Sequence, residues 1–498
     1  MRETTHYIDG KKIGTGTNSI PIVNPSNGEQ VATLPVADLS IVNKAVASSE
    51  EAFLNWSRLE PSRRASVIRT YYDLVIKYTD DICSLITEEH GKTLTDSRGE
   101  LVRGLENIEY AQGIVEHLKG EHTKELSRDL DSWSESSPLG VCVGITPFNF
   151  PAMVPLWMFP LSIACGNCFI LKPSEKVASA SLFLAELFIE SGLPPGVLNL
   201  VQGDSSAAEL LMNHAKVKAL SFVGSTSAAR SVYRTAGDSG KRVQALGGAK
   251  NHAVVLPDAD LEYVANSIMG AAFGSCGQRC MALSVVLSVT DEVGDRLAQL
   301  MAKKIKELRI GPGDENLDMG PLNSRFQKDR ILALVESGVN EGANLLVDGR
   351  EHPTCKLPGY YLGGCLFDQV RSEMSIYQEE IFGPVLCLMR AESFSEALEV
   401  VNGNPYGNGA TIFTRDGYGA RKFANGVQAG MVGINVPLPV PGANHSFGGW
   451  KDSRFGDLGA YGPDGVRFYT RRKTISQRWT LPDNESPMNF SFPGSLSD

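Results

Sequence analysis

The chain has 498 residues, of which 42% are hydrophobic and 21% are charged, and its formal net charge at pH 7 is −10. These values are ordinary for a globular protein long enough to form two or three domains. The acidic balance argues against a nucleic-acid-binding protein, because such proteins need a basic surface.

The first ten residues, MRETTHYIDG, contain neither an apolar stretch nor an Arg-rich amphipathic pattern. Those two patterns mark secretory and mitochondrial targeting segments. The nine cysteines are scattered, which disfavours a disulfide framework and favours a reducing compartment. We therefore expect a cytoplasmic protein; a mitochondrial protein whose presequence has been removed stays open as an alternative.

Short β-like pieces rich in Gly, Pro, Asn and Thr fill residues 1–35 and predict a hairpin-bearing entry segment. Hydrophobic residues then recur at steps of three and four, which predicts amphipathic helices beginning at Asp38, at Pro61 and at Leu101. Residues 119–138 are polar and poor in strand-forming side chains. We interpret them as an excursion or arm.

From residue 139 onward, short apolar runs alternate with helical patterns. The runs cover 140–145, 168–171, 197–201, 218–223 and 243–246. Repeated strand–helix units predict a parallel sheet with helices on both faces, whose ligands bind at the carboxyl ends of the strands. The apolar segment 151–171 contains three prolines and Asn167, so we interpret it as a buried helix and strand rather than a membrane span.

The second half of the chain shows the same alternation of predicted strands and helices. A strand is predicted over 283–289, and helices are predicted over 294–308, 324–341 and 393–401. A short buried strand follows at 431–435, and the tail beyond Lys473 begins with a strand-like pattern. The sequence thus predicts a second α/β unit.

Polar and small residues follow the strands of the first unit, where a ligand is expected. They are Thr146, Phe148 and Asn149 after the first strand, Lys172, Glu175 and Lys176 after the second, Ser225 after the fourth and Gly247 after the fifth. No G-x-G-x-x-G occurs, but the Gly224-Ser225 helix start can seat a phosphate through free backbone N–H groups. Lys172 has a plainer alternative as a solvated loop lysine.

The stretch 273–284 holds Cys276 and Cys280 among small residues, with Arg279 directly before the second cysteine. A neighbouring cation lowers the pKa of a thiol, and small residues allow a substrate to approach, so Cys280 is the candidate nucleophile. The alternative is a small buried hydrophobic residue. The Cys165-Gly-Asn-Cys168 pair has metal-site spacing but lacks a second pair and a nearby His, so no metal is predicted.

Together these segments resemble the aldehyde dehydrogenase superfamily, in family order and over nearly the whole chain. The matching stretches are 147–151, 171–175, 222–226, 246–248, 277–280, 380–384 and 447–449. The resemblance implies two Rossmann-like parallel-sheet α/β domains plus a small β oligomerisation arm, assembled into a homotetramer as a dimer of dimers. It implies an NAD-binding domain at 1–118 and 139–250, a catalytic domain at 251–450, and an arm at 119–138 and 474–498.

The resemblance also assigns roles. Cys280 would attack the aldehyde, and the Asn149 amide with the Cys280 N–H would stabilise the oxyanion. NAD would be held by Thr146, Phe148, Lys172, Glu175, Lys176, Ser225, Gly247 and Glu380. NAD is favoured over NADP because a carboxylate at Glu175 repels a 2′-phosphate.

One departure from the family pattern changes the expected reaction. Hydrolytic members carry a glutamate directly before the Leu-Gly-Gly run, whereas this chain has Ala245, and a methyl group cannot act as a base. A thiol ionises more readily than water, and the runs 277–284 and 248–252 resemble the branch that transfers its acyl group to coenzyme A. The resemblance therefore implies coenzyme A as co-substrate and a semialdehyde bearing a carboxylate.

Such a substrate needs a cation in the pocket. Arg279 is the best candidate because guanidinium matches carboxylate bidentately, and Arg103 resembles the second arginine of that branch. The alternative for Arg103 is a surface helix arginine. Two other functions stay open: a hydrolytic dehydrogenase with a relocated base, which Ala245 disfavours, and a catalytically silent relative, which the joint presence of Asn149, Cys280 and Glu380 disfavours.

Overall fold

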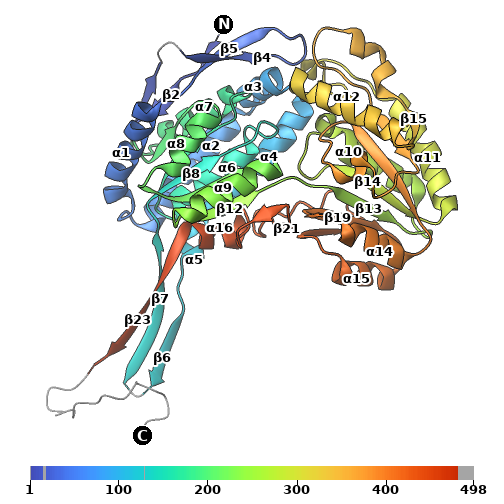
Figure 1. The fold of residues 1–498 in the computed structure, drawn as a ribbon. Helices are drawn as coiled ribbons and strands as arrows, with labels where there is room; N and C mark the ends of the chain where they lie inside the picture. Colours follow the sequence, from blue (N-terminus) through green and yellow to red (C-terminus); the bar gives the residue numbers. More distant parts are fainter. Residues whose placement is uncertain (1, 15–17, 128, 480–498) are drawn as a thin grey trace.

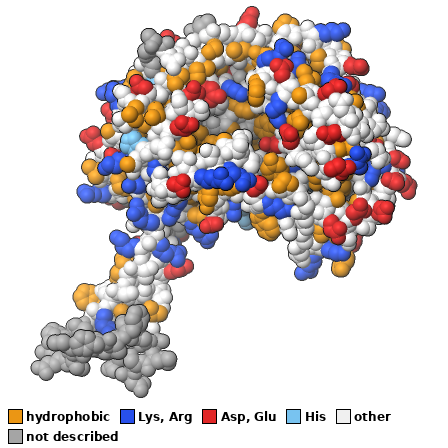
Figure 2. Space-filling view, in the orientation of Figure 1, with side chains coloured by type: hydrophobic (Ala, Val, Ile, Leu, Met, Phe, Trp, Pro, Cys, Tyr) orange, Lys and Arg blue, Asp and Glu red, His pale blue; other side chains and the backbone are white. Residues whose placement is uncertain are grey.

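A computed structural model describes residues 2–14, 18–127 and 129–479. Two α/β units stand side by side, each built on a largely parallel sheet, and a narrow β arm projects from the first of them (Figure 1). On the face shown in Figure 2, basic and acidic side chains intermingle over the described residues and form no extended basic stripe.

The first sheet has eight strands in the order β22-β12-β11-β8-β9-β10-β2-β3. Its five central strands are parallel and include every strand predicted between 140 and 246. They are β8 (Val141–Ile145), β9 (Cys168–Lys172), β10 (Leu198–Leu200), β11 (Val217–Val223) and β12 (Arg242–Leu246). Three antiparallel edge strands flank them: β2 (His6–Ile8), β3 (Lys11–Ile13) and β22 (Arg454–Phe455).

Helices cover this sheet on both faces, as parallel strands with continuous apolar runs require. The helices that contact the sheet are α1 (Leu39–Trp56), α6 (Met153–Ala164), α7 (Ala178–Glu190), α8 (Ser205–Asn213) and α9 (Thr226–Asp238). A further group packs against other helices of this unit: α2 (Pro61–Lys77), α3 (Thr79–His90), α4 (Leu94–Gln112) and α5 (Ile114–His117). The run predicted from Pro61 is split at Tyr78 into α2 and α3. The helix predicted from Leu101 begins earlier, because the Thr93 side chain caps its N-terminus.

The second sheet has the order β15-β16-β17-β14-β13-β19-β20, and all its pairs except β15–β16 are parallel. Its strands are β13 (Asn251–Val255), β14 (Leu283–Val289), β15 (Asn344–Val347), β16 (Cys365–Asp368), β17 (Val385–Ala391), β19 (Gly409–Phe413) and β20 (Met431–Ile434). The accompanying helices are α10 (Leu261–Phe273), α11 (Asp291–Lys306), α12 (Arg325–Asn340), α13 (Ser375–Gln378), α14 (Phe394–Gly403) and α15 (Gly417–Gly426). Helix α16 (Gly462–Tyr469) packs instead on α6 of the first unit.

Smaller elements complete the two units. One small sheet joins β1 (Arg2–Glu3), β5 (Gln30–Pro35) and β4 (Ser19–Val23), and another joins β18 (Tyr406–Gly407) and β21 (Trp450–Lys451). The β4–β5 and β2–β3 pairs are antiparallel, as the predicted entry hairpins require.

The arm is a three-stranded antiparallel sheet of β6 (His122–Ser127), β7 (Leu130–Pro138) and β23 (Thr470–Arg478). Its central pairing runs from Thr470 opposite Pro138 to Arg478 opposite Leu130. The segment 119–138 therefore supplies two of its strands and the start of 474–498 extends the third, while residues 480–498 lie outside the described residues. The role of this sheet in oligomerisation stays a prediction.

The predicted fold class, two parallel-sheet α/β units with a β arm, is confirmed. The predicted domain boundaries stay a prediction. Helix α6 is buried at every position, and it leads into the buried strand β9, as expected for the apolar segment 151–171. Across the described ranges, no helix is long and apolar enough to cross a membrane, and no group of three His, Cys, Asp or Glu side chains is placed to hold a metal ion.

Candidate active site

A cleft of about 1210 Å³ opens at the carboxyl ends of β8, β9, β11 and β12 and reaches the second unit. Ten of the predicted site residues line it: Thr146, Phe148, Asn149, Lys172, Glu175, Lys176, Ser225, Gly247, Cys280 and Glu380. The carboxyl ends of parallel strands share one edge of a sheet, so residues distant in sequence meet there. Their individual roles remain predictions.

Lys172 lies at the end of β9 and is almost completely buried, so the alternative of a solvated loop lysine is wrong. Its ammonium lies 3.6 Å from the Glu175 carboxylate. Burial lowers the pKa of Lys172, and the charge of Glu175 partly offsets this effect. Lys176 holds its ammonium 5.0 Å from the centre of the Phe148 ring. The two lysines and one carboxylate thus form a compact polar wall that fits the hydroxyls of a ribose.

Other residues at the cleft present backbone and hydroxyl groups. Ser225 caps α9 by accepting a hydrogen bond from the Ala228 N–H, and the exposed helix start faces the cleft. The Thr146 hydroxyl is buried without a hydrogen-bond partner. A Cβ at Gly248 would lie 2.5 Å from a carboxylate oxygen of Glu380, so that carboxylate packs directly on backbone. A helix N-terminus, an unpaired hydroxyl and close backbone are features that a dinucleotide can use.

The loop before the candidate nucleophile is a 3-10 turn, η1 (Gly274–Gly277), with backbone φ angles of 53° at Ser275, 53° at Cys276 and 68° at Gly277. Consecutive left-handed residues are unfavourable for side chains other than glycine, and such strain is held in place only by the surrounding structure. Cys276 is buried in the core of the second unit. Of the two cysteines in this stretch, only Cys280 lines the cleft.

The backbone of Cys280 is held by two side-chain amides that sequence reasoning missed. Asn251 and Asn408 each donate to its carbonyl oxygen at 3.0 Å. Burial and the charge of Glu380 raise the pKa of the Cys280 thiol to about 12, while nearby backbone N–H groups and Arg279 lower it by less. The predicted effect of Arg279 therefore has the right sign, but burial outweighs it.

Glu380 enters the cleft from the second unit. Its carboxylate accepts a hydrogen bond from the Ala249 N–H at 2.9 Å. Burial raises the pKa of Glu380 to about 7, and that hydrogen bond together with the charges of Lys250 and Arg330 limits the rise. Two basic side chains hold the backbone at this position. Lys250 donates to the Glu379 carbonyl oxygen at 2.7 Å, and Arg330 donates to the Glu380 carbonyl oxygen at 3.1 Å.

The two arginines predicted to bind a carboxylate already have partners. The Arg279 guanidinium pairs with the Asp96 carboxylate and, with Cys280, borders a small cavity of about 20 Å³. Arg103 on α4 donates to the Glu106 carboxylate and to the Pro441 carbonyl oxygen, each at 2.6 Å. The role of the two arginines toward substrate stays a prediction.

Ala245 is fully buried in β12, within the hydrophobic cluster that contains Ile145 and Phe222. Its methyl group offers no acid or base to the cleft. Sequence reasoning also missed Lys92, which donates to the Asn149 carbonyl oxygen, and Glu100, which accepts hydrogen bonds from the Ala152 and Met153 N–H groups. The available signal was the four-residue spacing of Asp96 and Glu100 on α4.

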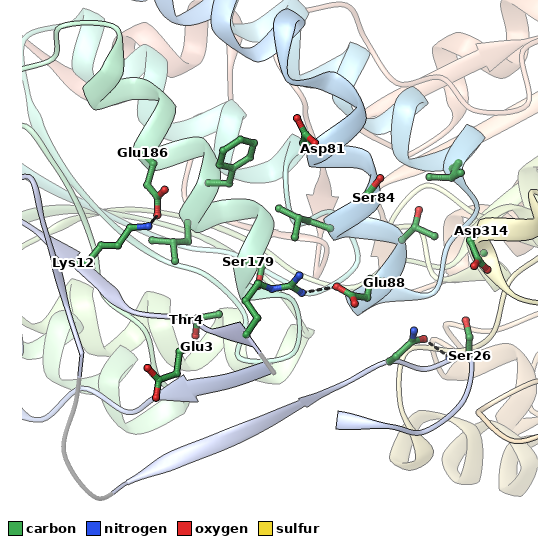
Figure 3. A pocket seen from close by; sticks show the side chains of 18 residues that line it. Glu3, Thr4, Lys12, Ser26, Asp81, Ser84, Glu88, Ser179, Glu186 and Asp314 are labelled. Atoms are coloured by element: carbon green, nitrogen blue, oxygen red, sulfur yellow. Dashed lines mark hydrogen bonds and ion pairs between the residues drawn. The ribbon is translucent and has the colours of Figure 1, made fainter. Parts of the chain in front are cut away.

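A second cavity of about 790 Å³ lies between the entry strands, α3 and α7 (Figure 3). Both of its basic side chains pair with acidic ones, Lys12 2.8 Å from Glu186 and Arg2 2.6 Å from Glu88. It contains none of the predicted site residues.

A sequence model described as "Aldehyde dehydrogenase family" matches residues 13–475. The chain belongs to the aldehyde dehydrogenase family. The family resemblance predicted from the motifs is thereby confirmed, and with it the class of oxidoreductase.

Among relatives in this family, the malonate-semialdehyde dehydrogenase of Pseudomonas aeruginosa is 53% identical over 490 residues, which are 98% of this chain and 99% of the relative. Malonate-semialdehyde dehydrogenase 1 of Oceanobacillus iheyensis is 45% identical, with 96% and 99% covered. The crystal structure of a methylmalonate-semialdehyde dehydrogenase from Oceanimonas doudoroffii matches with a TM-score of 0.95 and 50% identity, over 97% of this chain and 99% of that one. A protein assigned the same activity, from Sinorhizobium meliloti and complexed with NAD, matches with a TM-score of 0.95 and 47% identity, with the same coverage.

Proposed function

We propose that this protein is an NAD-dependent, coenzyme A-acylating semialdehyde dehydrogenase. It converts malonate semialdehyde to acetyl-CoA and methylmalonate semialdehyde to propionyl-CoA, with CO₂ and NADH as the other products. The names of the relatives and the NAD complex of one of them support the substrates and the cofactor. The alternative is a hydrolytic aldehyde dehydrogenase that releases a free acid.

In this proposal the cleft holds NAD. Lys172, Glu175 and Lys176 hold the adenosine ribose region, and Ser225 at the start of α9 meets the pyrophosphate. Thr146, Phe148 and Gly247 line the cleft, and Glu380 holds the nicotinamide ribose. NAD, when bound, accepts the hydride that the aldehyde carbon gives up.

Cys280 is the nucleophile. Its thiol gives its proton to water in the cleft and the sulfur attacks the aldehyde carbon, so the carbonyl oxygen becomes an oxyanion. The Asn149 side-chain amide and the Cys280 N–H donate hydrogen bonds to that oxyanion. Loss of hydride from the same carbon then leaves a thioester on Cys280.

The thioester permits decarboxylation without a metal. Its carbonyl is β to the substrate carboxylate, so the electron pair of the breaking C–C bond enters an enolate that a proton then quenches. Arg279 and Arg103 recognise the carboxylate before it leaves, Arg279 by exchanging its contact with Asp96 for one with the substrate.

The proposal that coenzyme A, rather than water, accepts the acyl group rests on the presence of Ala245. The position that supplies a water-activating carboxylate in hydrolytic members is a buried methyl group here. The thiol of coenzyme A needs less activation than water, and it displaces Cys280 from the thioester. We further propose a cytoplasmic homotetramer, a dimer of dimers, in which the arm of β6, β7 and β23 makes subunit contacts; measurement of the native mass tests the assembly.

The decisive experiment follows NADH formation from malonate semialdehyde with and without coenzyme A. With coenzyme A we expect steady turnover and acetyl-CoA as product. Without it we expect a burst of about one NADH per site followed by slow leakage, since the thioester has no efficient acceptor. Cys280→Ser abolishes both phases. Steady turnover to a free acid without coenzyme A would favour the hydrolytic alternative.

A further inference from the structure

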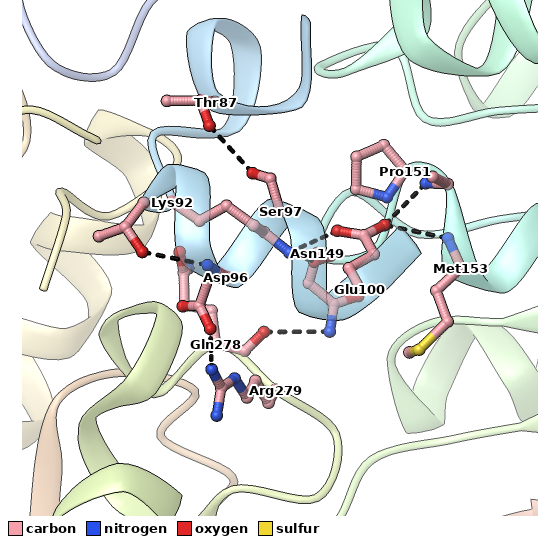
Figure 4. Close-up of polar contacts among 12 residues, drawn as sticks. Thr87, Lys92, Asp96, Ser97, Glu100, Asn149, Pro151, Met153, Gln278 and Arg279 are labelled. Atoms are coloured by element: carbon pink, nitrogen blue, oxygen red, sulfur yellow. Dashed lines mark hydrogen bonds and ion pairs between the residues drawn. The ribbon is translucent and has the colours of Figure 1, made fainter. Parts of the chain in front are cut away.

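One helix holds both sides of the proposed catalytic centre. Lys92 directly precedes Thr93, the N-cap of α4, and Asp96 and Glu100 lie four residues apart on the first turns of that helix, so the side chains of Asp96 and Glu100 share one face. Figure 4 shows this face between the Asn149 segment and the loop that carries Gln278 and Arg279. Asp96 pairs with Arg279, which directly precedes Cys280. Lys92 and Glu100 contact the backbone of residues 149–153.

Glu100 secures the segment that follows Asn149. One of its carboxylate oxygens accepts hydrogen bonds from the N–H groups of Ala152, at 2.7 Å, and Met153, at 3.0 Å. These groups open α6, where the helix dipole favours a negative charge. The other oxygen lies 2.8 Å from the Lys92 ammonium, and both side chains are at most 1% exposed.

Lys92 secures Asn149 itself. Its ammonium donates to the Asn149 carbonyl oxygen at 2.6 Å and lies 4.5 Å from the centre of the Phe150 ring. The buried Lys92–Glu100 ion pair therefore makes hydrogen bonds to the backbone at both ends of residues 149–153. From this fixed backbone the Asn149 amide reaches across to donate to the Gln278 carbonyl oxygen at 3.0 Å.

A buried ion pair contributes little to stability compared with hydrophobic residues of the same volume, since removing both charges from water is costly. The pair is better explained as a device that fixes the geometry of the Asn149 backbone, because oxyanion stabilisation requires donors in place before the reaction. We infer that Lys92 and Glu100 are positioning residues that hold the Asn149 amide in register with Cys280. This inference rests on the proposed function, but only on its aldehyde-oxidising step.

A double-mutant cycle between Glu100→Gln and Asn149→Ala tests it. The readout is the single-turnover NADH burst without coenzyme A, measured with malonate semialdehyde and with propionaldehyde. We expect Asn149→Ala to slow the burst about 10²- to 10³-fold, and Glu100→Gln to slow it up to about a hundredfold, because small misplacements are costly. In the Asn149→Ala background the Glu100 change should cost less than about twofold further. Binding of NAD, followed by intrinsic fluorescence, should stay unchanged.

Glu109→Gln, an exposed site on the same helix, is the matched control and should leave the burst unaltered. An equal loss from Glu100→Gln in both backgrounds would assign the pair a general structural role and overturn the inference, as would no loss at all. If Glu100→Gln does not fold, Lys92→Met/Glu100→Gln, which leaves no buried charge unpaired, enters the same cycle. Because coenzyme A is absent, hydrolytic turnover would refute the proposed acyl acceptor and leave the cycle readable. A wild-type protein with no burst on either aldehyde would overturn both proposals.

Discussion

The side-chain amide of Asn149 donates to the main-chain oxygen of Gln278 at 3.0 Å. Asn149 follows β8 of the first sheet, whereas Gln278 precedes Cys280 in the second unit. The hydrogen bond therefore bridges the two units beside the candidate nucleophile. An amide carries two N–H donors, so one can keep this bridge while the other serves an oxyanion.

The first prediction concerns Arg279. Arg279→Lys should raise the KM for malonate semialdehyde about 10- to 100-fold, because a bidentate charge-assisted contact is lost. The kinetics of propionaldehyde, which lacks a carboxylate, should change little. Parallel steady-state measurements on the two aldehydes decide the matter. Equal damage to both would mean that Arg279 serves only its pair with Asp96.

The second prediction concerns the Cys280 thiol, whose pKa burial raises to about 12. Alkylation of Cys280 by iodoacetamide in the free protein should accelerate about tenfold per pH unit and keep rising beyond pH 9, where an ordinary thiol levels off. Cys280→Ser supplies the background from the other cysteines. A plateau near pH 8 would show that the thiolate is stabilised more than the buried geometry allows.

Glu380 provides the third prediction, through its pKa of about 7. If the ionised carboxylate accepts hydrogen bonds from a ribose, NAD affinity should rise with pH through about 7 and become flat in Glu380→Gln. Since the folded pKa is raised above the ordinary 4.5, the contribution of Glu380 to stability is present below about pH 4.5 and lost as pH rises through 7. Denaturant unfolding of the unsubstituted protein and of Glu380→Gln between about pH 4.5 and 7 checks the sign. The free energy of unfolding of Glu380→Gln should rise relative to that of the unsubstituted protein as the pH increases.

The fourth prediction concerns the strained loop. A Cβ at Gly277 would lie 2.2 Å from the Gly383 carbonyl oxygen, and its φ is +68°. Gly277→Ala should therefore destabilise the fold by about 1–3 kcal/mol and slow the NADH burst by displacing Cys280. Gly270→Ala in α10, where a Cβ meets nothing within 4 Å, is the control and should be neutral or stabilising. Thermal unfolding and burst rates of both variants test the contrast.

The sequence by itself determined the alternation of strands and helices in the first unit, because hydrophobic periodicity is a local property. It also determined which residues line the cleft: Lys172 ends a strand, Ser225 and Gly247 follow strands, and parallel strands end at one edge. The missing base at Ala245 was equally readable, since a methyl group has no acid–base chemistry in any fold.

Only the tertiary structure decided the partners and the electrostatics. Asp96 meets Arg279 across 183 positions of the chain, and Lys92 meets Asn149 across 57, distances over which no periodicity operates. The raised pKa values of Cys280 and Glu380 arise from burial by both units, which exists only once they pack together. The residue types determine which chemical groups are present at single positions, whereas the geometry and ionisation of these groups depend on what the fold places around them.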